Sequence, residues 1–347
     1  MRNHRRIVSI ALTGVLLSGA CTSLQKKPMQ ESSSPASVLA PMPEAVTSFG
    51  AVSQDGWLYV MGGHKGERHE YSAPMVSGGF HRLKLSEGRS WESLPAAEPA
   101  QGVALAAHGT CVYRVGGMAA RNQPGEKSDL HSKDLVTCFD TRKGRWEPMP
   151  PLPEPRSSHD AVVLGDALYV GGGWTLAGSS AKGEWRDTLL RLDLKASSPK
   201  WECIPQPFRR RALAMAGAGG RLYFLGGIDA EGNTSSEVDI YDVGGSKWSK
   251  GPDLPPGPMK GFGCSAVAQG GAIFFSGMKG DVCRLAEDGS RWIVVGKLTR
   301  PRFFHRLVPA GTRHLVAAGG EDSEGKLKEL EVILPAEEPT PVSKEAR

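Results

Sequence analysis

Six short apolar runs that end in glycine recur along this chain of 347 residues, and the spacing between them is nearly regular. An internal repeat with a period of roughly 40 to 55 residues indicates a propeller, a solenoid or an array. The repeat therefore constrains the architecture before any single residue is interpreted. The glycines that end the runs are Gly62, Gly63, Gly116, Gly117, Gly172, Gly173, Gly226, Gly227, Gly277, Gly319 and Gly320.

Each repeat carries signals for four strands. In the third repeat, residues 156–164 predict a first strand, residues 165–166 a tight hairpin turn and residues 167–172 a second strand. After a loop, residues 189–194 alternate apolar and polar side chains as a third strand, and residues 200–204 predict a fourth. The same order recurs along the chain, so we expect an all-β fold: a six-bladed β-propeller with four antiparallel strands per blade.

A tryptophan lies in the expected fourth strand of five repeats. These residues are Trp91, Trp146, Trp201, Trp248 and Trp292. Together with the glycine pair and the third strand, they resemble the Kelch repeat family over residues 36–334. The resemblance implies that the glycine pair lets neighbouring sheets approach closely and that the tryptophan packs between blades. Both roles suit a residue without a Cβ and a large aromatic ring.

The sixth repeat lacks its tryptophan. After its glycine pair the chain offers one more strand, residues 329–334, and then a proline- and charge-rich tail over residues 335–347 that predicts disorder. Residues 36–43 match the other fourth-strand segments without the aromatic. We predict that this N-terminal strand completes blade six and closes the ring, which removes two free sheet edges.

Residues 1–21 are typical of a secretory signal. Arginines precede a short apolar stretch, and small residues lead into Cys21. The segment resembles a bacterial lipoprotein box, which implies a lipid on Cys21 and an exported lipoprotein of the outer membrane or periplasm. Ser18 stands where the best boxes carry leucine, so plain cleavage and a periplasmic or secreted protein remain the alternative. Residues 22–35 then predict a flexible tether.

Without Cys21 the chain has an odd number of cysteines, namely Cys111, Cys138, Cys203, Cys264 and Cys283. Cys111 and Cys138 fall on adjacent strands of one expected blade, so one interpretation is a disulfide between them. The other is that all five are buried as small apolar residues. No pair has the close spacing of zinc ligands, and we expect no metal site.

Basic residues are expected where the innermost strands open the central channel. Aligning the repeats by their glycines places Arg156, Arg210, Lys260 and Arg302 there, in blades three to six. A cleft lined by one sign of charge focuses its field on anions, and arginine suits carboxylates. The alternative is that these residues pair with backbone carbonyls or neighbouring acids.

The loops between the second and third strands are expected on the same face, where binding residues concentrate. They add Arg121, Trp174 and Trp185 as ligand-binding candidates. An exposed tryptophan there could stack on a sugar ring, or it could simply pin its loop. His159 and His305 occupy matching positions in two repeats, which indicates a structural role.

The favoured function is a non-catalytic, envelope-anchored module that binds a partner protein or an anionic glycan. We expect no cofactor, and the modest net charge of +5 without a basic block argues against nucleic acid. The alternative is a sugar-active enzyme. The final blade has a Gly-Lys-Leu-x-x-x-Arg opening and the segment Gly319-Gly320-Glu321, which are similar to sialic acid mutarotases (N-acetylneuraminate epimerases).

Overall fold

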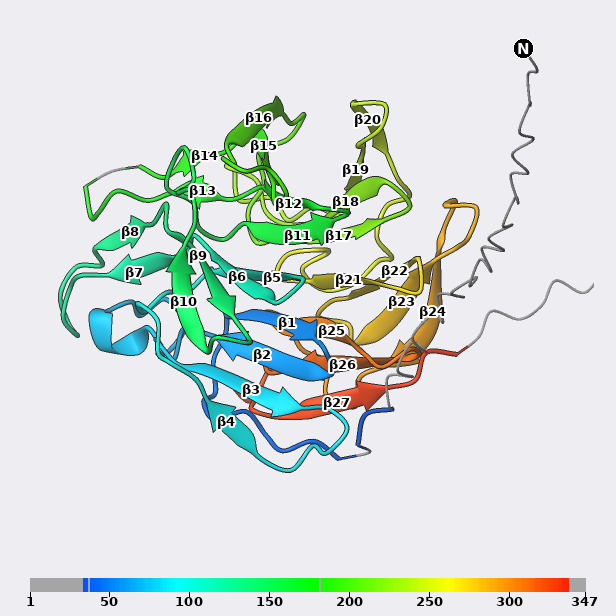
Figure 1. Cartoon of the computed structure of the whole chain (residues 1–347), viewed down its shortest axis with the longest axis horizontal. Coiled ribbons are helices and arrows are strands. Elements are labelled where there is room, and N and C mark those ends of the chain that lie inside the picture. Colours follow the sequence, from blue (N-terminus) through cyan, green and yellow to red (C-terminus); the bar gives the residue numbers. More distant parts are fainter. Residues whose placement is uncertain (1–33, 37, 181, 337–347) are drawn as a thin grey trace, which may run out of the picture. The chain divides into compact units, whose positions relative to one another are not determined.

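The computed structural model describes residues 34–36, 38–180 and 182–336, and within them six antiparallel sheets follow one another in chain order (Figure 1). Their innermost strands are β1 (Gly50–Gln54), β5 (Ala104–His108), β11 (Asp160–Leu164), β17 (Ala214–Ala218), β21 (Ser265–Gln269) and β25 (Arg306–Ala310). Each of these strands contacts the next, and β25 returns to contact β1. The predicted six-bladed propeller is therefore confirmed.

The second strands are β2 (Trp57–Met61), β6 (Cys111–Val115), β12 (Ala167–Gly171), β18 (Arg221–Leu225), β22 (Ala272–Ser276) and β26 (His314–Ala318). The third strands are β3 (Phe80–Lys84), β9 (Val136–Asp140), β15 (Thr188–Asp193), β19 (Val238–Asp242), β23 (Asp281–Leu285) and β27 (Leu330–Ile333). Five described sheets have a fourth strand: β4 (Trp91–Ser93), β10 (Arg145–Pro148), β16 (Trp201–Pro205), β20 (Lys247–Lys250) and β24 (Trp292–Lys297).

Two short strand pairs and one 3-10 turn lie in the loops between second and third strands. Strand β7 (Met118–Ala120) pairs with β8 (Leu130–Ser132), and β13 (Trp174–Thr175) pairs with β14 (Glu184–Trp185). A single 3-10 turn, η1, covers Ala73–Met75. In the part of the chain that the structure describes, no helix has the length and apolar character of a membrane span.

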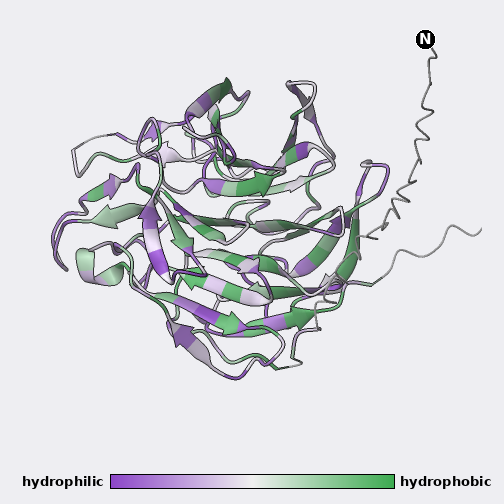
Figure 2. Ribbon diagram, viewed as in Figure 1, coloured by the Kyte–Doolittle hydropathy of each residue, from purple (hydrophilic) through white to green (hydrophobic). Residues whose placement is uncertain are grey.

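Hydrophobic side chains from adjacent sheets form the cores, and Figure 2 shows hydrophobic and hydrophilic residues alternating along the strands. The five tryptophans pack against these cores. Each indole N–H also donates to a backbone carbonyl of the preceding blade, at 2.9 to 3.1 Å. From blade two to blade five, the acceptor is the proline four residues after the preceding tryptophan, namely Pro95, Pro150, Pro205 and Pro252.

The glycine pairs lie where consecutive blades approach most closely. A Cβ on Gly62 would clash with the carbonyl oxygen of Ala100 in the next blade. The second glycine, Gly63, has a φ of 109° and donates its N–H to that same oxygen at 2.8 Å. Glycine is required here because the backbone needs both a positive φ and a close approach.

The ring closes where predicted, but not by a strand. Trp91 of blade one donates its indole N–H to the carbonyl of Ala40 at 3.1 Å. In the other blades this acceptor lies four residues after a tryptophan, so Ala36 occupies the position of the absent sixth tryptophan. Met42 N–H donates to Lys328 O of blade six at 2.7 Å. Residues 38–43 nevertheless form no regular ladder, and the sheet of blade six keeps three strands. The segment therefore joins blade six through the Met42–Lys328 hydrogen bond and through core packing rather than through a full ladder.

Several predictions fall on residues that are not described. The signal segment 1–21 with Cys21, the tether up to residue 33 and the tail from residue 337 lie outside the described residues. At the start of the predicted tail, Ala336 N–H donates to Val295 O of blade five at 2.8 Å.

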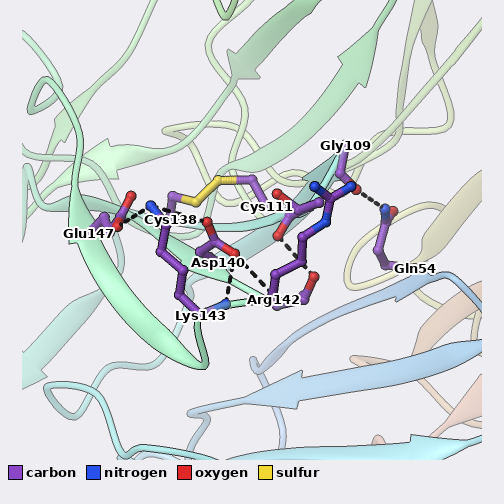
Figure 3. Close-up of a disulfide and its surroundings, with 10 residues drawn as sticks. Gln54, Gly109, Cys111, Cys138, Asp140, Arg142, Lys143 and Glu147 are labelled. Atoms are coloured by element: carbon purple, nitrogen blue, oxygen red, sulfur yellow. Dashed lines mark hydrogen bonds and ion pairs between the residues drawn. A yellow bond between two sulfur atoms is a disulfide. The ribbon is translucent and has the colours of Figure 1, made fainter.

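Cys111 and Cys138 form a disulfide between β6 and β9, with their Cα atoms 5.4 Å apart (Figure 3). Of the remaining cysteines, Cys264 and Cys283 are buried and Cys203 is exposed. The disulfide interpretation of the sequence is therefore confirmed, and the alternative of five buried thiols is wrong. Adjacent strands of one blade bring the two cysteines within bridging distance.

Candidate functional site

A collar of backbone surrounds the central channel just before the innermost strands. Its six residues have φ between 50° and 65°, and they are Ser48, Gly102, Ser158, Ala212, Gly263 and Phe304. From blade two onward, the N–H of each residue donates to the carbonyl of the preceding one at 2.7 to 2.9 Å. All six line a cavity of about 440 Å³, so the collar is part of its wall.

A second tier of residues extends the cavity toward the loops between second and third strands. In five blades the residue before the collar forms a backbone bridge with the first residue after the glycine pair. These pairs are Thr47 with His64, Gln101 with Met118, Ser157 with Trp174, Arg211 with Ile228, and Phe303 with Glu321. The face that the sequence predicted for binding is the face on which this cavity lies.

None of the four predicted basic residues lines the cavity. The guanidinium groups of Arg156, Arg210 and Arg302 are all buried. Arg156 donates to Thr188 O and Oγ1 at 2.7 Å each, and burial lowers its pKa to about 10. The prediction that these residues open onto the channel is wrong, because each turns outward from its collar to the strands of its own blade.

Arg210 and Arg302 illustrate the structural alternative. Arg210 pairs with the buried carboxylate of Asp239 and donates to Ser235 Oγ at 3.0 Å. Arg302 pairs with Glu331 and donates to the Glu329 carbonyl oxygen at 3.0 Å. These arginines hold the second and third strands together at the point where the sheet meets its loop.

Lys260 stands out of register. In blades one to three, the N–H of the second glycine donates to the backbone carbonyl of the residue that the sequence alignment places at the channel mouth of the next blade. In blade four, the corresponding bond runs from Gly227 N–H to Gly261 O, at 2.9 Å. Gly261 therefore occupies the position that the sequence alignment gave to Lys260. Lys260 is exposed and lies outside the cavity wall.

Arg211, which the sequence analysis did not select, lines the cavity. Its guanidinium carbon lies 4.2 Å from the ring centre of Trp174 and 5.5 Å from that of Trp185. Burial lowers its pKa and the nearby Tyr71 opposes that shift, while arginine stays protonated in proteins. No carboxylate pairs with Arg211 among the described residues. Its position in the repeat, directly after the buried arginine and directly before the collar residue, was the sequence signal that could have identified it.

The two tryptophan candidates act as a pair. Trp174 and Trp185 face each other across the β13–β14 hairpin, with ring centres 5.6 Å apart. Trp174 lines the cavity, whereas Trp185 supports it from behind, so the pair pins the loop and covers Arg211. Arg121 is exposed and does not line the cavity.

Two other cations lie in the cavity wall. Arg68 pairs with Glu321, and its Nη2 donates to Asp322 O at 3.0 Å. The Lys326 ammonium donates to Gly66 O and meets no carboxylate in the described ranges. Because Arg68 neutralises Glu321, Arg211 and Lys326 leave an excess of positive charge around the cavity.

The far end of the cavity is crossed by an ion pair. Arg306 at the start of β25 reaches Asp160 at the start of β11, with Nη1 and Oδ1 3.1 Å apart. His159 and His305 lie beside it in the position held elsewhere by Phe49, Val103, Leu213 and Cys264. Burial lowers the pKa of each histidine to about 3, so both are neutral packing residues as the sequence indicated.

Across the ranges that the structure describes, no cluster of three histidine, cysteine or acidic side chains is arranged to hold a metal ion.

The comparisons with known proteins agree with this architecture. A model described as the KLHDC2/KLHL20/DRC7 Kelch-repeats domain matches residues 102–320, more than half of the chain. The chain is 30% identical over 206 residues to Kelch repeat and BTB domain-containing protein 12 of Danio rerio, covering 56% of this chain and 31% of that protein. It is 27% identical over 212 residues to Beta-scruin of Limulus polyphemus, covering 58% of this chain and 21% of that protein.

The chain thus spans less than a third of the length of either relative. Among solved structures, YjhT is similar with a TM-score of 0.66 and 17% identity, over 86% of this chain and 99% of YjhT. At that identity the likeness concerns the fold alone.

Proposed function

This chain belongs to the Kelch-repeat family, and we propose that it is a binding module that takes an anionic group of a partner protein or a glycan into its central cavity. The observation that carries the proposal is Arg211. It is a partly buried cation, with a buried and unpaired Nε, in the wall of a cavity of about 440 Å³, and it has no carboxylate partner in the described part of the chain. A buried charge without a partner is costly, and a bound anion would offset that cost.

Two more hydrogen-bond donors support an acceptor-rich ligand. Gln101 Nε2 and Trp174 Nε1 are buried, belong to residues of the cavity wall and have no partner among the described residues. Buried polar groups are normally satisfied, so such donors point to an absent partner. In this proposal, the anion-binding residues are Arg211 and Lys326 in place of the predicted Arg156, Arg210, Lys260 and Arg302.

The test uses two acidic probes, poly-L-glutamate for proteins and polygalacturonate for glycans, on the purified full chain. We expect at least one probe to bind the parent, and we expect Arg211→Ala to weaken that binding by at least about tenfold. Arg121→Ala removes an arginine outside the cavity and should bind like the parent. Equal binding by Arg211→Ala, or no binding of either acidic probe, would overturn the proposal.

We also propose that the protein is exported and held at the bacterial envelope by a lipid on Cys21. The sequence of residues 1–21 supports this, and so does the disulfide, because disulfides persist in oxidising compartments. In a Gram-negative host, labelled palmitate should enter the parent and not Cys21→Ala. An unlabelled parent, or a labelled variant, would contradict lipidation.

The enzymatic alternative has no observation in its favour. The two histidines nearest the Arg306–Asp160 pair are neutral packing residues, and Glu321 is held by Arg68. Binding accounts for the cavity without a catalytic step.

A further inference from the structure

The cavity wall is not uniform, because blades five and six add a cluster of apolar side chains to it, beside Glu321 and Lys326. Met259, Phe262, Phe303 and Phe304 all belong to the lining. Phe304 packs edge-on against Phe262 at 5.2 Å and beside Phe303 at 4.8 Å between ring centres. In blades one to four, the residues that correspond to Phe262 and Phe303 are Thr47, Gln101, Ser157 and Arg211.

Phe304 departs from the rest of the collar. Its φ is 52°, in the left-handed region, and the five equivalent residues are serine, glycine or alanine. A bulky side chain in that conformation costs on the order of 1–3 kcal/mol and persists where its surroundings hold it. Such outliers cluster at functional sites, and here the outlier adds an aromatic ring to the cavity wall.

Met259 adds an adaptable surface beside the phenylalanines. Its side chain is 41% exposed, and both Met259 and the next residue have positive φ. Exposed methionine is common on surfaces that accommodate apolar side chains of a partner. The rings of Phe262, Phe303 and Phe304 offer no hydrogen-bond donor or acceptor, so sugar hydroxyl groups set against these three residues would lose their partners.

We propose that the occupant is a protein segment in which an aspartate or glutamate stands beside a large apolar residue. This rests on the proposed function and names its partner class. The carboxylate binds Arg211, and the apolar side chain packs on Phe262, Phe304 and Met259. A cavity of about 440 Å³ has the size that a few side chains fill.

The experiment is a selection of phage-displayed random peptides on the full chain. The enriched peptides should share an acidic residue next to phenylalanine, leucine, methionine or tryptophan. Enrichment of peptides that lack either feature overturns the inference, and so does the absence of enrichment.

The selected peptide is then tested against Arg211→Ala and Phe262→Ala, after thermal melting shows that both are folded. Amidation of the peptide acid should weaken binding to the parent about tenfold and leave Arg211→Ala unaffected. Replacing the apolar peptide residue by alanine should weaken binding to the parent and leave Phe262→Ala unaffected, while Phe262→Leu keeps most of the affinity. If the affinity lost by the change in the peptide simply adds to the affinity lost by the change in the protein, the two groups do not contact each other, and this placement is contradicted.

The two levels of proposal fail differently. If polygalacturonate binds in an Arg211-dependent way and no peptide is enriched, the binding function stands and the peptide class is wrong. If no acidic probe of either class depends on Arg211, both proposals fall.

Discussion

Arg210 and Arg211 are adjacent in the sequence and lie in opposite environments. Arg210 is 3% exposed, pairs with Asp239 and belongs to a series that recurs as Arg156 and Arg302. Arg211 lies on the cavity side under Trp174 and has no acidic partner in the described residues. The recurring position builds the scaffold, whereas the position beside it differs from blade to blade and gives the cavity its chemistry.

The same contrast separates the layer between blades from the cavity wall. Between blades, the second glycines of blades one to four and the tryptophans of blades two to five make nearly identical hydrogen bonds. By contrast, the position before the collar holds five residue types in the six blades, and all of these residues except Ser157 line the cavity: Thr47, Gln101, Ser157, Arg211, Phe262 and Phe303. Substitutions between blades should therefore affect stability, and substitutions in the wall should affect binding.

The largest effect is expected where the ring closes. Leu39 and Met42 are 6% and 3% exposed and pack in the core that joins blade six to blade one. The double variant Leu39→Ala/Met42→Ala should lower the free energy of unfolding by roughly 4 kcal/mol or more, measured by urea denaturation. Val38→Ala, at a position that is 80% exposed, is the control and should melt like the parent. A double variant as stable as the parent would mean that residues 38–43 do not close the ring.

The adjacent arginines test the comparison itself. Arg210→Ala leaves the buried Asp239 with Lys250 as its remaining cation and should cost about 3 kcal/mol of stability. Arg211→Ala removes no ion pair and should change the free energy of unfolding by less than about 1 kcal/mol. Similar losses in both variants would remove the distinction between scaffold and cavity wall.

A smaller effect is expected from the two buried histidines, and it depends on pH. Their pKa is about 3 in the folded protein against 6.5 for an ordinary histidine, so between these values the unfolded chain binds more protons. Stability should fall as the pH drops from 6.5 toward 3, by up to about 1.4 kcal/mol per pH unit for each histidine. His159→Leu/His305→Leu adopts the leucine found at the matching position 213 and should flatten this part of the curve. Parallel curves for the variant and the parent would show that the histidines do not titrate differently on unfolding.

The sequence predicted the repeated features well and the singular ones poorly. Glycine spacing located the strands, and the missing tryptophan correctly placed residues 36–43 at the closure. The same alignment misplaced Lys260 by one residue, because blade five has a single glycine, Gly277, where the other blades have a pair. Arg211 was missed because repetition guided the selection, and a cavity residue that breaks the repeat has no counterpart to align.

The most direct test of the account reverses the charge of Arg211. With the purified full chain, Arg211→Glu should abolish binding of poly-L-glutamate and create measurable binding of poly-L-lysine, while its thermal melt stays close to that of the parent. Unchanged binding of poly-L-glutamate by the folded Arg211→Glu variant would contradict the claim that this arginine receives the anionic group of a partner.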